Sequence, residues 1–306
     1  MKKGKYIITG CAGFIGSHLV NYLFKDYDII LVDDLSEGSI SKLPKLLQKK
    51  LIKRSIQDIK SFNYKGIKGI FHLAAQSSVQ ISINSFYKSS TNNLNSSLKV
   101  FEIAKKFSIP VVYASSSAVY GNLSVGDDVK NNLDISSPYA QDKLALENYA
   151  RTFFKNFKIS SVGLRLFNVY GPNQNANSPY SAVIPIFIDR MKKNASITIN
   201  GGYQTRDFIY IEDILNIMKF SMQLAQSKKN SIVVNVGTGR SVNINYLFKI
   251  IGKSIPNNSK IIRKKLDEFD PKKSSGKFIK FKKFFKNKNI KFTKLEDGLL
   301  KTIRSY

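Results

Sequence analysis

Short apolar strands alternate with helical patterns through the first half of the chain. The stretches KYIITG, YDIILVDD, GIFHLAA and IPVVYASSS read as strands, and FIGSHLVNYLFK and residues 91–107 as helices. Strands that are separated by helices pair in parallel, because the chain must cross back over the sheet between them. The alternation therefore predicts an α/β fold, with a doubly wound parallel sheet that helices cover on both faces.

The pattern becomes less regular after SVGLRLFNVYGP. Helices are expected near residues 182–193, 212–225 and 243–252, with strands in RDFIYI and SIVVNVG. We interpret the chain as two lobes: residues 1–165 bind a dinucleotide, and residues 166–306 form a smaller α/β lobe, mainly for substrate. Near its end, phenylalanines recur at helical spacing among lysines in KFIKFKKFF. This pattern fits a basic helix for a membrane or RNA, or the buried side of a surface helix, which we favour.

A glycine-rich loop, TGCAGFIG, joins the first strand to the first helix. Its Gly10, Gly13 and Gly16 allow a tight turn and a close approach of the backbone to a pyrophosphate at the helix N-terminus. Asp33 ends the second strand about 20 residues later, where a carboxylate accepts hydrogen bonds from ribose hydroxyls. Asp33 and Asp34 would repel a 2′-phosphate. The loop therefore predicts a Rossmann-type site for NAD.

Two further residues near this loop allow two interpretations each. Asp58 follows the third strand, where it either reaches the adenine amine or is an ordinary exposed loop aspartate. Cys11 lies inside the glycine loop, and we interpret it as a small filler and not as a nucleophile.

The stretch SPYAQDKLALE places Tyr139 and Lys143 four residues apart near the start of a helix. Ser137 and Pro138 provide a cap and a fixed first dihedral angle, so the two side chains should share one face. A lysine charge beside a phenol favours the phenolate and lowers its pKa, which makes the tyrosine a candidate acid/base. An exposed pair on a solvated helix is the alternative.

Composition limits the other classes of function. The 306 residues contain one cysteine and two histidines, so we expect neither disulfides nor a metal site. No apolar run reaches about 18 residues and the N-terminus lacks signal-peptide features, so we expect a cytoplasmic protein without membrane association. The net charge of +28 would attract phosphorylated metabolites or nucleic acid alike. A non-catalytic protein with a dinucleotide-binding fold that binds RNA through its positive surface is therefore the alternative to an enzyme.

Together, TGCAGFIGSHL, HLAA, SSSAVYG, YAQDK, LRLFNVYGP, TRDFIYIEDI and NVGTG resemble the extended short-chain dehydrogenases, in the branch of nucleotide-sugar epimerases and dehydratases. The resemblance implies that Tyr139 and Lys143 are the catalytic pair, that Lys143 also holds the nicotinamide ribose, and that Ser116 is the catalytic Ser/Thr. The NAD-binding residues that it implies are Gly10, Gly13, Phe14, Ile15, Gly16, Asp33, Asp58, Ala74, Ala75, Asn93, Tyr139 and Lys143. The implied substrate-binding residues are Ser116, Ser117, Asn168, Val183, Arg206 and Ser274.

On the substrate side, the resemblance implies that Asn168 and Arg206 contact the nucleotide diphosphate. The forked guanidinium of an arginine fits the geometry of phosphate oxygens. A surface ion pair of Arg206 with Asp207 or Asp213 is the alternative. These epimerases often have a second diphosphate arginine in an Arg-Pro-Gly-Asp-like stretch. This chain has RKKLDEFDPKKS there, in which Arg263 or Lys265 is a candidate substitute.

The resemblance also bears on the reaction. Ser117 and Ala118 stand where the 4,6-dehydratases have an Asp-Glu pair, and a 3,5-epimerase often needs a cysteine that this chain has only in its cofactor loop. We therefore expect an NAD-dependent 4-epimerase of a UDP-hexose or UDP-N-acetylhexosamine for polysaccharide biosynthesis. A nucleotide-sugar 4-ketoreductase or dehydrogenase is the alternative enzyme. A nucleic-acid partner is not expected.

Two finer expectations also rest on the resemblance. Small residues at Ser274 or Ser275 leave room for an acetamido group at C2, and residues 178–187 resemble the branch that acts on N-acetylated sugars. The helices near 91–107 and 138–157 imply a homodimer, with Leu94, Leu98, Phe101 and Tyr149 as candidates for its seam or for packing within one subunit.

Overall fold

The computed structural model describes residues 2–60, 65–130, 133–176, 182–266 and 270–306. The chain divides into two compact units that are each built from separate segments. The first unit comprises Met1–Ser116, Ser137–Arg165 and Leu215–Val234. The second comprises Ser117–Ser136, Leu166–Ile214 and Asn235–Tyr306. Residues 117–136 thus belong to the second unit although they lie before residue 166, and residues 215–234 return to the first.

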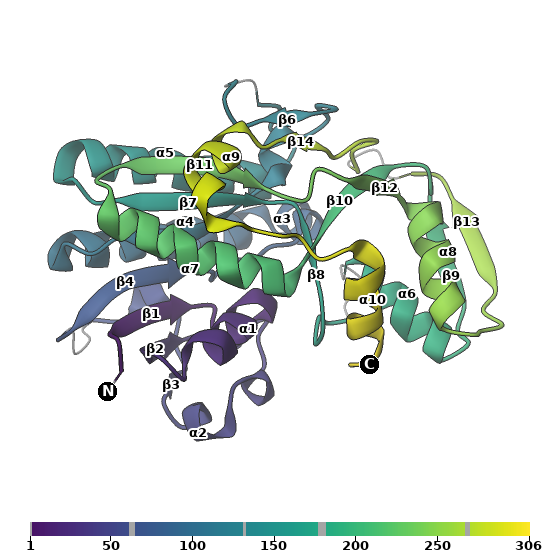
Figure 1. Cartoon of the computed structure of the whole chain (residues 1–306), viewed down its shortest axis with the longest axis horizontal. Helices are drawn as coiled ribbons and strands as arrows, with labels where there is room; N and C mark the ends of the chain where they lie inside the picture. The colour runs from purple at the N-terminus through teal and green to yellow at the C-terminus, as the bar shows by residue number, and fades with distance from the viewer. Residues whose placement is uncertain (1, 61–64, 131–132, 177–181, 267–269) are drawn as a thin grey trace. The chain divides into compact units, whose positions relative to one another are not determined.

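A seven-stranded sheet in the order β11-β7-β5-β4-β1-β2-β3 forms the centre of the first unit (Figure 1). Its strands are β1 (Lys5–Thr9), β2 (Asp28–Val32), β3 (Leu51–Ile52), β4 (Ile67–His72), β5 (Val111–Ser116), β7 (Ser161–Leu166) and β11 (Ser231–Val236). The helices are α1 (Phe14–Leu23), α2 (Lys45–Gln48), α3 (Val79–Asn84), α4 (Phe86–Phe107), α5 (Pro138–Phe157) and α7 (Ile211–Ser227). Short 3-10 turns cover Ile40–Lys42 and Ile56–Asp58.

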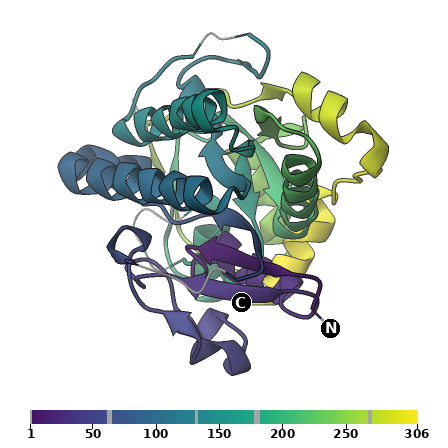
Figure 2. The same ribbon diagram turned by 90° about the vertical axis from the view of Figure 1, so that its left-hand side faces the viewer.

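The pairing of the strands confirms the predicted doubly wound sheet. β1 pairs in parallel with both β2 and β4, and β3 and β5 continue outward from these two in parallel. The strand order therefore reverses between β1 and β4, which is where sheets of this type bind ligands beyond their carboxyl ends. Helices α4 and α5 lie side by side on one face and α7 on the other (Figure 2).

Apolar residues of the central strands and of α4 and α5 form one buried core. Ile7, Ile70 and Val111 are completely buried, as a strand covered on both faces requires. Phe101 of α4 is also completely buried and packs edge-on against Tyr113 of β5. Phe101 therefore packs within one subunit, which was the alternative to a place at a dimer seam.

Helix α4 begins earlier than its apolar pattern indicates. The sequence pattern predicts a helix over residues 91–107, whereas the helix runs over Phe86–Phe107. Its first turns contain Phe86 and Tyr87, which are 61% and 81% exposed. These two side chains do not belong to an apolar stripe on a buried face of the helix. Helical periodicity in the sequence therefore could not indicate this part of the helix.

The second unit contains smaller sheets and helices. Its strands are β6 (Gly126–Asp127), β8 (Asn168–Tyr170), β9 (Ile197–Asn200), β10 (Thr205–Tyr210), β12 (Ser241–Asn243), β13 (Ile261–Lys264) and β14 (Gly276–Lys277). They pair as β12-β10-β8, β13-β9 and β14-β6. Its helices are α6 (Val183–Lys192), α8 (Ile244–Ser254), α9 (Ile279–Phe285) and α10 (Leu295–Ile303), with 3-10 turns at Ser117–Tyr120 and Lys286–Lys288.

The lysine-rich segment forms helix α9, with its aromatic side inward. Phe281 and Phe285 are buried and stack on each other, whereas Lys282 and Lys283 are exposed. The interpretation of this stripe as the buried side of a surface helix is confirmed. Among the residues that the structure describes, no helix is long and apolar enough to span a membrane.

Candidate active site

The glycine-rich turn after β1 is packed backbone against backbone. Gly10 has a positive φ of 67°, and a β-carbon there would lie 2.6 Å from the backbone nitrogen of Ala74. A β-carbon on Gly16 would lie 1.9 Å from the carbonyl oxygen of Gly10. Gly13 is the N-cap residue of α1, so the amides of the first turn of this helix begin at the loop. Larger residues at Gly10 or Gly16 would force the turn apart.

A pocket lies at the carboxyl ends of the strands that follow this turn. Its lining includes Gly10 and Gly13 after β1, Asp33 and Asp34 after β2, Arg54–Ile56 after β3, and Leu73–Ala75 after β4. Concave glycine backbone at a helix N-terminus, with a carboxylate at the end of the next strand, is the donor set that a dinucleotide requires. The residues present therefore fit NAD. Asp58 is exposed and is not among the residues that line this pocket.

Asp33 has a second role that its position in the sequence did not indicate. Its Oδ2 accepts a hydrogen bond from the backbone N–H of Ala12, at 2.8 Å, and its Oδ1 accepts one from Leu35, also at 2.8 Å. Burial raises the pKa of this carboxyl group, while these N–H donors oppose the rise. Asp33 therefore lines the pocket and also holds the glycine loop at the end of β2 through its hydrogen bond with Ala12.

Asn93 connects the loop after β4 to the helix that carries Tyr139. Its Oδ1 accepts from the backbone N–H of Gln76 at 2.8 Å, and its Nδ2 donates to the Gln76 carbonyl oxygen at 3.2 Å. The same Nδ2 donates to the carboxylate of Asp142 at 3.0 Å. Asn93 is buried, so these bonds are shielded from water. Asn93 thus fixes the Gln76 backbone next to α5, and its place in support of the cofactor region stays a prediction.

Helix α5 starts at the residues that its capping signals predict. Ser137 Oγ accepts from the backbone N–H of Ala140 at 3.2 Å, and Pro138 occupies the first turn. Tyr139 and Lys143 follow on one face, and the Lys143 Nζ lies 5.6 Å from the centre of the Tyr139 ring. Both are buried, which excludes the alternative of an exposed pair on a solvated helix.

The end of strand β5 supplies the third side chain of the group. The side chains of Ser116 and Tyr139 are hydrogen-bonded to each other. The Lys143 ammonium donates to the carbonyl oxygen of Ala114, at 2.8 Å. The first unit thus brings Ser116, Tyr139 and Lys143 together, with two hydroxyl groups in contact and a cation beside them.

Burial has the largest effect on the ionisation of this group. It raises the pKa of Tyr139, and the hydrogen bond with Ser116 opposes the rise. It lowers the pKa of Lys143 to about 8, against the charges of Asp142 and Glu147. The expectation that the pKa of Tyr139 is lowered beside Lys143 is therefore wrong for the protein alone, because loss of solvent raises this pKa by more than the Ser116 hydrogen bond lowers it.

Three of the predicted substrate residues are close together in the second unit. Asn168 of β8 pairs with Phe208 of β10, and its Nδ2 donates to the carbonyl oxygen of Asp207 at 3.2 Å. Ser274 donates its backbone N–H to Thr205, the neighbour of Arg206, at 3.0 Å. Ser117 opens the 3-10 turn after β5, and Val183 opens α6. Residues 178–181 of the stretch that includes Val183 lie outside the described residues.

Arg206 forms an ion pair that the sequence did not indicate. Its guanidinium donates to the carboxylate of Asp270, and to the carbonyl oxygen of Thr205 at 2.7 Å. The alternative partners Asp207 and Asp213 have other donors. Asp207 accepts from Thr238 and Gly239 of the NVGTG stretch, and Asp213 accepts from Thr293. Arg263 lies in β13 and donates to Asn245 at 3.1 Å.

The comparison with known families now decides the class of protein. The model of the "NAD dependent epimerase/dehydratase family" matches residues 6–237. The chain belongs to the NAD-dependent epimerase/dehydratase family. A curated relative from Methanocaldococcus jannaschii, provisionally named a UDP-glucose 4-epimerase, is 35% identical over 258 residues, which cover 81% of this chain and 82% of the relative.

Two solved structures are similar over nearly the whole of this epimerase/dehydratase chain. A UDP-N-acetylglucosamine 4-epimerase from Methanobrevibacter ruminantium, in complex with UDP-N-acetylmuramic acid, is 35% identical with a TM-score of 0.90, covering 100% of this chain and 98% of its own. A UDP-glucose 4-epimerase from Thermotoga maritima, with UDP-glucose, is 29% identical with a TM-score of 0.89, covering 98% of each chain. As a member of this family, the protein uses NAD as its cofactor.

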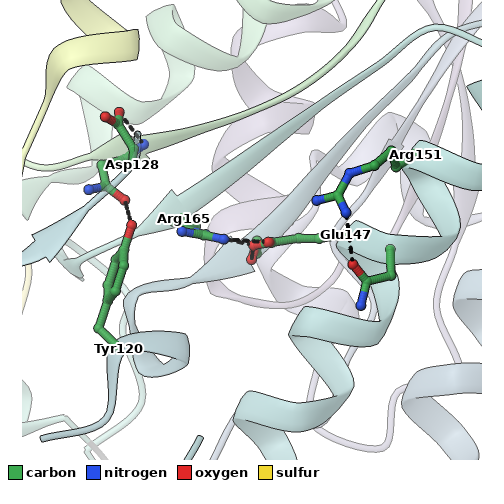
Figure 3. A network of polar contacts seen from close by, with 8 residues as sticks. Tyr120, Asp128, Glu147, Arg151 and Arg165 are labelled. Atoms are coloured by element: carbon green, nitrogen blue, oxygen red, sulfur yellow. Dashed lines mark hydrogen bonds and ion pairs between the residues drawn. The ribbon is translucent and has the colours of Figure 1, made fainter. Parts of the chain in front are cut away.

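The sequence patterns did not predict a buried polar cluster that lies beside Ser116, Tyr139 and Lys143. Arg165 of β7 and Ser115 of β5 both donate to the carboxylate of Glu147 of α5, and Figure 3 shows the pair of Arg165 and Glu147. Two signals were present in the sequence. Glu147 continues the four-residue spacing of Tyr139 and Lys143, and Arg165 is a single charge inside the buried strand SVGLRL. Figure 3 also shows a second network, in which Tyr120 donates to Asn235 at 2.7 Å.

Proposed function

We propose that the chain is an NAD-dependent nucleotide-sugar 4-epimerase that inverts C4 of a UDP-hexose or UDP-N-acetylhexosamine for polysaccharide biosynthesis. The observation that carries the proposal is the pair of hydrogen-bonded hydroxyl groups of Ser116 and Tyr139 beside the Lys143 ammonium. The UDP-glucose and UDP-N-acetylglucosamine 4-epimerases among the structural relatives support the substrate class.

The residues beside Ser116 favour epimerisation over elimination of water. The turn Ser117–Tyr120 directly follows Ser116 and contains Ser117, Ala118, Val119 and Tyr120. None of these has a carboxyl group, whereas elimination of water from the sugar needs an acid and a base next to the ketone. A 4-epimerase needs only one acid/base at the C4 oxygen, and the pair of hydroxyl groups supplies it.

Each catalytic side chain has a distinct task. The Tyr139 phenolate takes the proton from the C4 hydroxyl of the sugar, and in the reverse step the Tyr139 hydroxyl returns it. The Ser116 hydroxyl donates a hydrogen bond to the same sugar oxygen and so holds it beside Tyr139. Lys143, fixed by the Ala114 carbonyl oxygen, provides a positive charge that favours the phenolate and binds the ribose of the cofactor.

The cofactor supplies what these residues lack. When bound, NAD would supply reversible hydride transfer at C4, which inversion of this carbon through a 4-ketose requires. The residues that would hold it are the backbone of Gly10 and Gly13, the Asp33 carboxylate, and the backbone of Ala74 and Ala75 at the end of β4. The acidic Asp33 favours NAD over its 2′-phosphorylated form.

The sugar class depends on the late loop of the second unit. Arg206 would bind the diphosphate, and Ser274 would face the C2 substituent of the sugar. Ser274 is small, and its backbone is fixed through Thr205 at 3.0 Å and through Ser241, whose hydroxyl donates to the Ser274 carbonyl oxygen at 3.0 Å. A fixed small residue leaves room for an acetamido group. We therefore favour an N-acetylated UDP-sugar as the substrate.

The protein should act as a homodimer through α4 and α5. Four aromatic side chains on these helices are exposed: Phe86 at 61%, Tyr87 at 81%, Tyr149 at 39% and Phe157 at 42%. Leu94 and Leu98 are half-buried and remain candidates for the same seam. Light scattering on the purified protein at micromolar concentration should give twice the mass of one chain, and a monomeric mass would contradict this proposal.

A panel of UDP-sugars tests the proposed function directly. The purified protein is incubated with UDP-glucose, UDP-galactose and their N-acetylated forms, and the products are identified by NMR. A 4-epimerase produces the C4 epimer with its bound NAD and consumes no added NADH. Stoichiometric consumption of NADH would identify a ketoreductase instead. A gel shift with RNA that is stronger than the binding of nucleotide sugars would favour the non-catalytic alternative.

A further inference from the structure

The Glu147 bracket, which consists of Ser115, Glu147 and Arg165, joins three elements of the first unit. Glu147 Oε1 accepts from the Ser115 hydroxyl at 2.5 Å and from Arg165 Nε at 2.8 Å, and its Oε2 accepts from Arg165 Nη2 at 2.6 Å. The Glu147 side chain is 0% exposed and that of Arg165 is 7% exposed. The carboxylate of one helix is thus bonded to two strands at once.

Stability alone gives a weak reason for such a cluster. Removing both charges from water costs about as much as their attraction returns, and apolar side chains of similar size often stabilise a fold equally well. The directional bonds do fix a position. A carboxylate that accepts two parallel N–H bonds from Arg165 and one O–H bond from Ser115 tolerates little sliding of α5 along the sheet.

That position matters because the bracket lies next to the catalytic group on both of its elements. Ser115 directly precedes Ser116 on β5. Glu147 follows Lys143 by one turn of α5 and Tyr139 by two, about 12 Å along the helix axis at 1.5 Å per residue. A shift of α5 relative to β5 would therefore change the contact between Tyr139 and Ser116. Lys143 donates to Ala114 of the same strand, so the bracket and this bond hold the helix at two points.

We propose that the Glu147 bracket is a positioning device that keeps the Tyr139 hydroxyl in contact with the Ser116 hydroxyl. The proposal deepens the proposed function and rests on it only for the effect on turnover. Ser115, Glu147 and Arg165 are positioning residues, because each acts through α5 or β5 and not on the sugar. Their loss should misplace Tyr139 while leaving intact the part of the cofactor pocket around Gly10, Asp33 and Ala74, since none of the three is among the residues that line it.

The test removes one bond of the bracket and leaves its ion pair. Ser115→Ala deletes only the donor from β5. We expect kcat to fall about 10- to 100-fold, the loss that misplacement by about 1 Å can cause. The KM, the NAD content and the melting temperature should stay near the wild-type values. Unchanged kcat would overturn the inference, and so would a loss of the folded state, which would make the bracket a device for stability.

Tyr113→Phe is the matched control. Tyr113 is completely buried on the same strand, near Glu147 and Arg165, yet its hydroxyl has no hydrogen-bond partner among the residues that the structure describes. This variant therefore removes a hydroxyl group from the same surroundings without removing a bond. It should keep the wild-type kcat. A fall as large as that of Ser115→Ala would mean that turnover responds to any disturbance of this strand, which would overturn the inference.

A second variant removes the charges. Glu147→Leu combined with Arg165→Met replaces the ion pair by apolar side chains of similar size, which should leave the free energy of unfolding near that of the wild type or above it. The kcat of this folded double variant should still fall at least about tenfold, by the same misplacement. Wild-type turnover in this variant would overturn the inference, because none of the three hydrogen bonds to Glu147 then remains.

A titration of Tyr139 tests the positioning without any sugar. Tyrosine labelled with ¹³C at Cζ reports ionisation by NMR in the NAD-loaded protein, and Tyr139→Phe identifies the signal. The Ser116 contact opposes the rise in the pKa of Tyr139, so loosening it in Ser115→Ala should lower the ionisation constant about two- to tenfold. An unmoved titration would overturn the inference. If the wild type converts no UDP-sugar, the proposed function fails and this titration still decides the role of the bracket.

Discussion

The stability of the first unit should depend on pH through His72, a buried histidine at the end of β4. Its Nδ1 lies 2.8 Å from the Thr9 hydroxyl, and its Nε2 lies 3.2 Å from the Ser97 hydroxyl. Ser97 donates its own proton to the Asn93 carbonyl oxygen at 2.7 Å, so it accepts from His72. Thr9 accepts from the backbone N–H groups of Leu73 and Ala74 and donates to Nδ1. Every bond is therefore satisfied by a neutral ring protonated at Nε2.

The size of the effect follows from the pKa of His72. Burial, and to a smaller extent the charge of Lys143, lowers this pKa from 6.5 to about 3. Between pH 6.5 and pH 3, His72 binds a proton in the unfolded chain but not in the folded one. The contribution of the neutral ring to stability is therefore complete above pH 6.5 and decreases as the pH falls toward 3. The maximum loss is roughly 5 kcal/mol, and the loss between pH 7 and pH 5 is about 2 kcal/mol.

Urea unfolding at pH 5, 6 and 7 measures this loss. The chain has only two histidines, so His72→Gln and His18→Gln form a matched pair of variants. The amide of glutamine can accept and donate one hydrogen bond each but does not titrate. His72→Gln should lose about 2 kcal/mol less than the wild type between pH 7 and pH 5, whereas His18→Gln should follow the wild type. The carboxylates are common to all three proteins and cancel in the comparison.

Two results would refute this reasoning. If His72→Gln and the wild type lose stability in parallel between pH 7 and pH 5, His72 binds its proton in the folded state. If the dependence disappears in His18→Gln instead, the titrating histidine has been misidentified. A lower stability of His72→Gln at pH 7 would not refute it, because the prediction concerns the change with pH.

Three predictions concern the catalytic group and the sugar pocket. Tyr139→Phe should lower kcat about 100- to 10,000-fold, since it removes the acid/base, yet keep the wild-type ratio of NAD to protein measured after purification; substantial turnover would contradict the assignment. Because burial lowers the pKa of Lys143 to about 8, kcat should fall as the pH rises through 8 and this ammonium loses its proton, and Lys143→Ala should lower the ratio of NAD to protein measured after purification; a flat profile around pH 8 would contradict this role. Ser274→Tyr should lower kcat/KM for acetylated sugars at least about tenfold relative to UDP-glucose, and equal losses on both would show a structural role.

Local patterns were sufficient for the fold and for the centre of the site. The alternation of strands and helices, the turn at Gly10 and Gly16, and the capped start of α5 all depend on neighbours within a few residues. The spacing of Tyr139 and Lys143 is of the same kind, because residues four apart on a helix share a face whatever surrounds it. The sequence could therefore predict which residues meet there.

Contacts between distant residues could not be predicted in this way. Arg206 and Asp270 are 64 residues apart and Ser115 and Glu147 are 32 apart, and nothing in either local pattern specifies the partner. The predicted direction of the pKa shift of Tyr139 was wrong for a related reason. The direction of the pKa shift depends on how much solvent the fold removes, and α5 packed against β5 removes enough to outweigh the hydrogen bond with Ser116.

The same burial suggests how the charge states of Tyr139 and Lys143 would depend on the cofactor. Loss of solvent makes the Tyr139 phenol harder to ionise and the Lys143 ammonium easier to deprotonate, and both changes oppose the charge states that proton transfer requires. Within the chain, the carboxylates of Asp142 and Glu147 keep Lys143 charged, but their negative charges do not favour a phenolate. The Lys143 ammonium does, and NAD, when bound, would add the positive charge of its oxidised nicotinamide. We therefore expect Tyr139 to ionise at a lower pH in the NAD-loaded protein than in the protein without NAD.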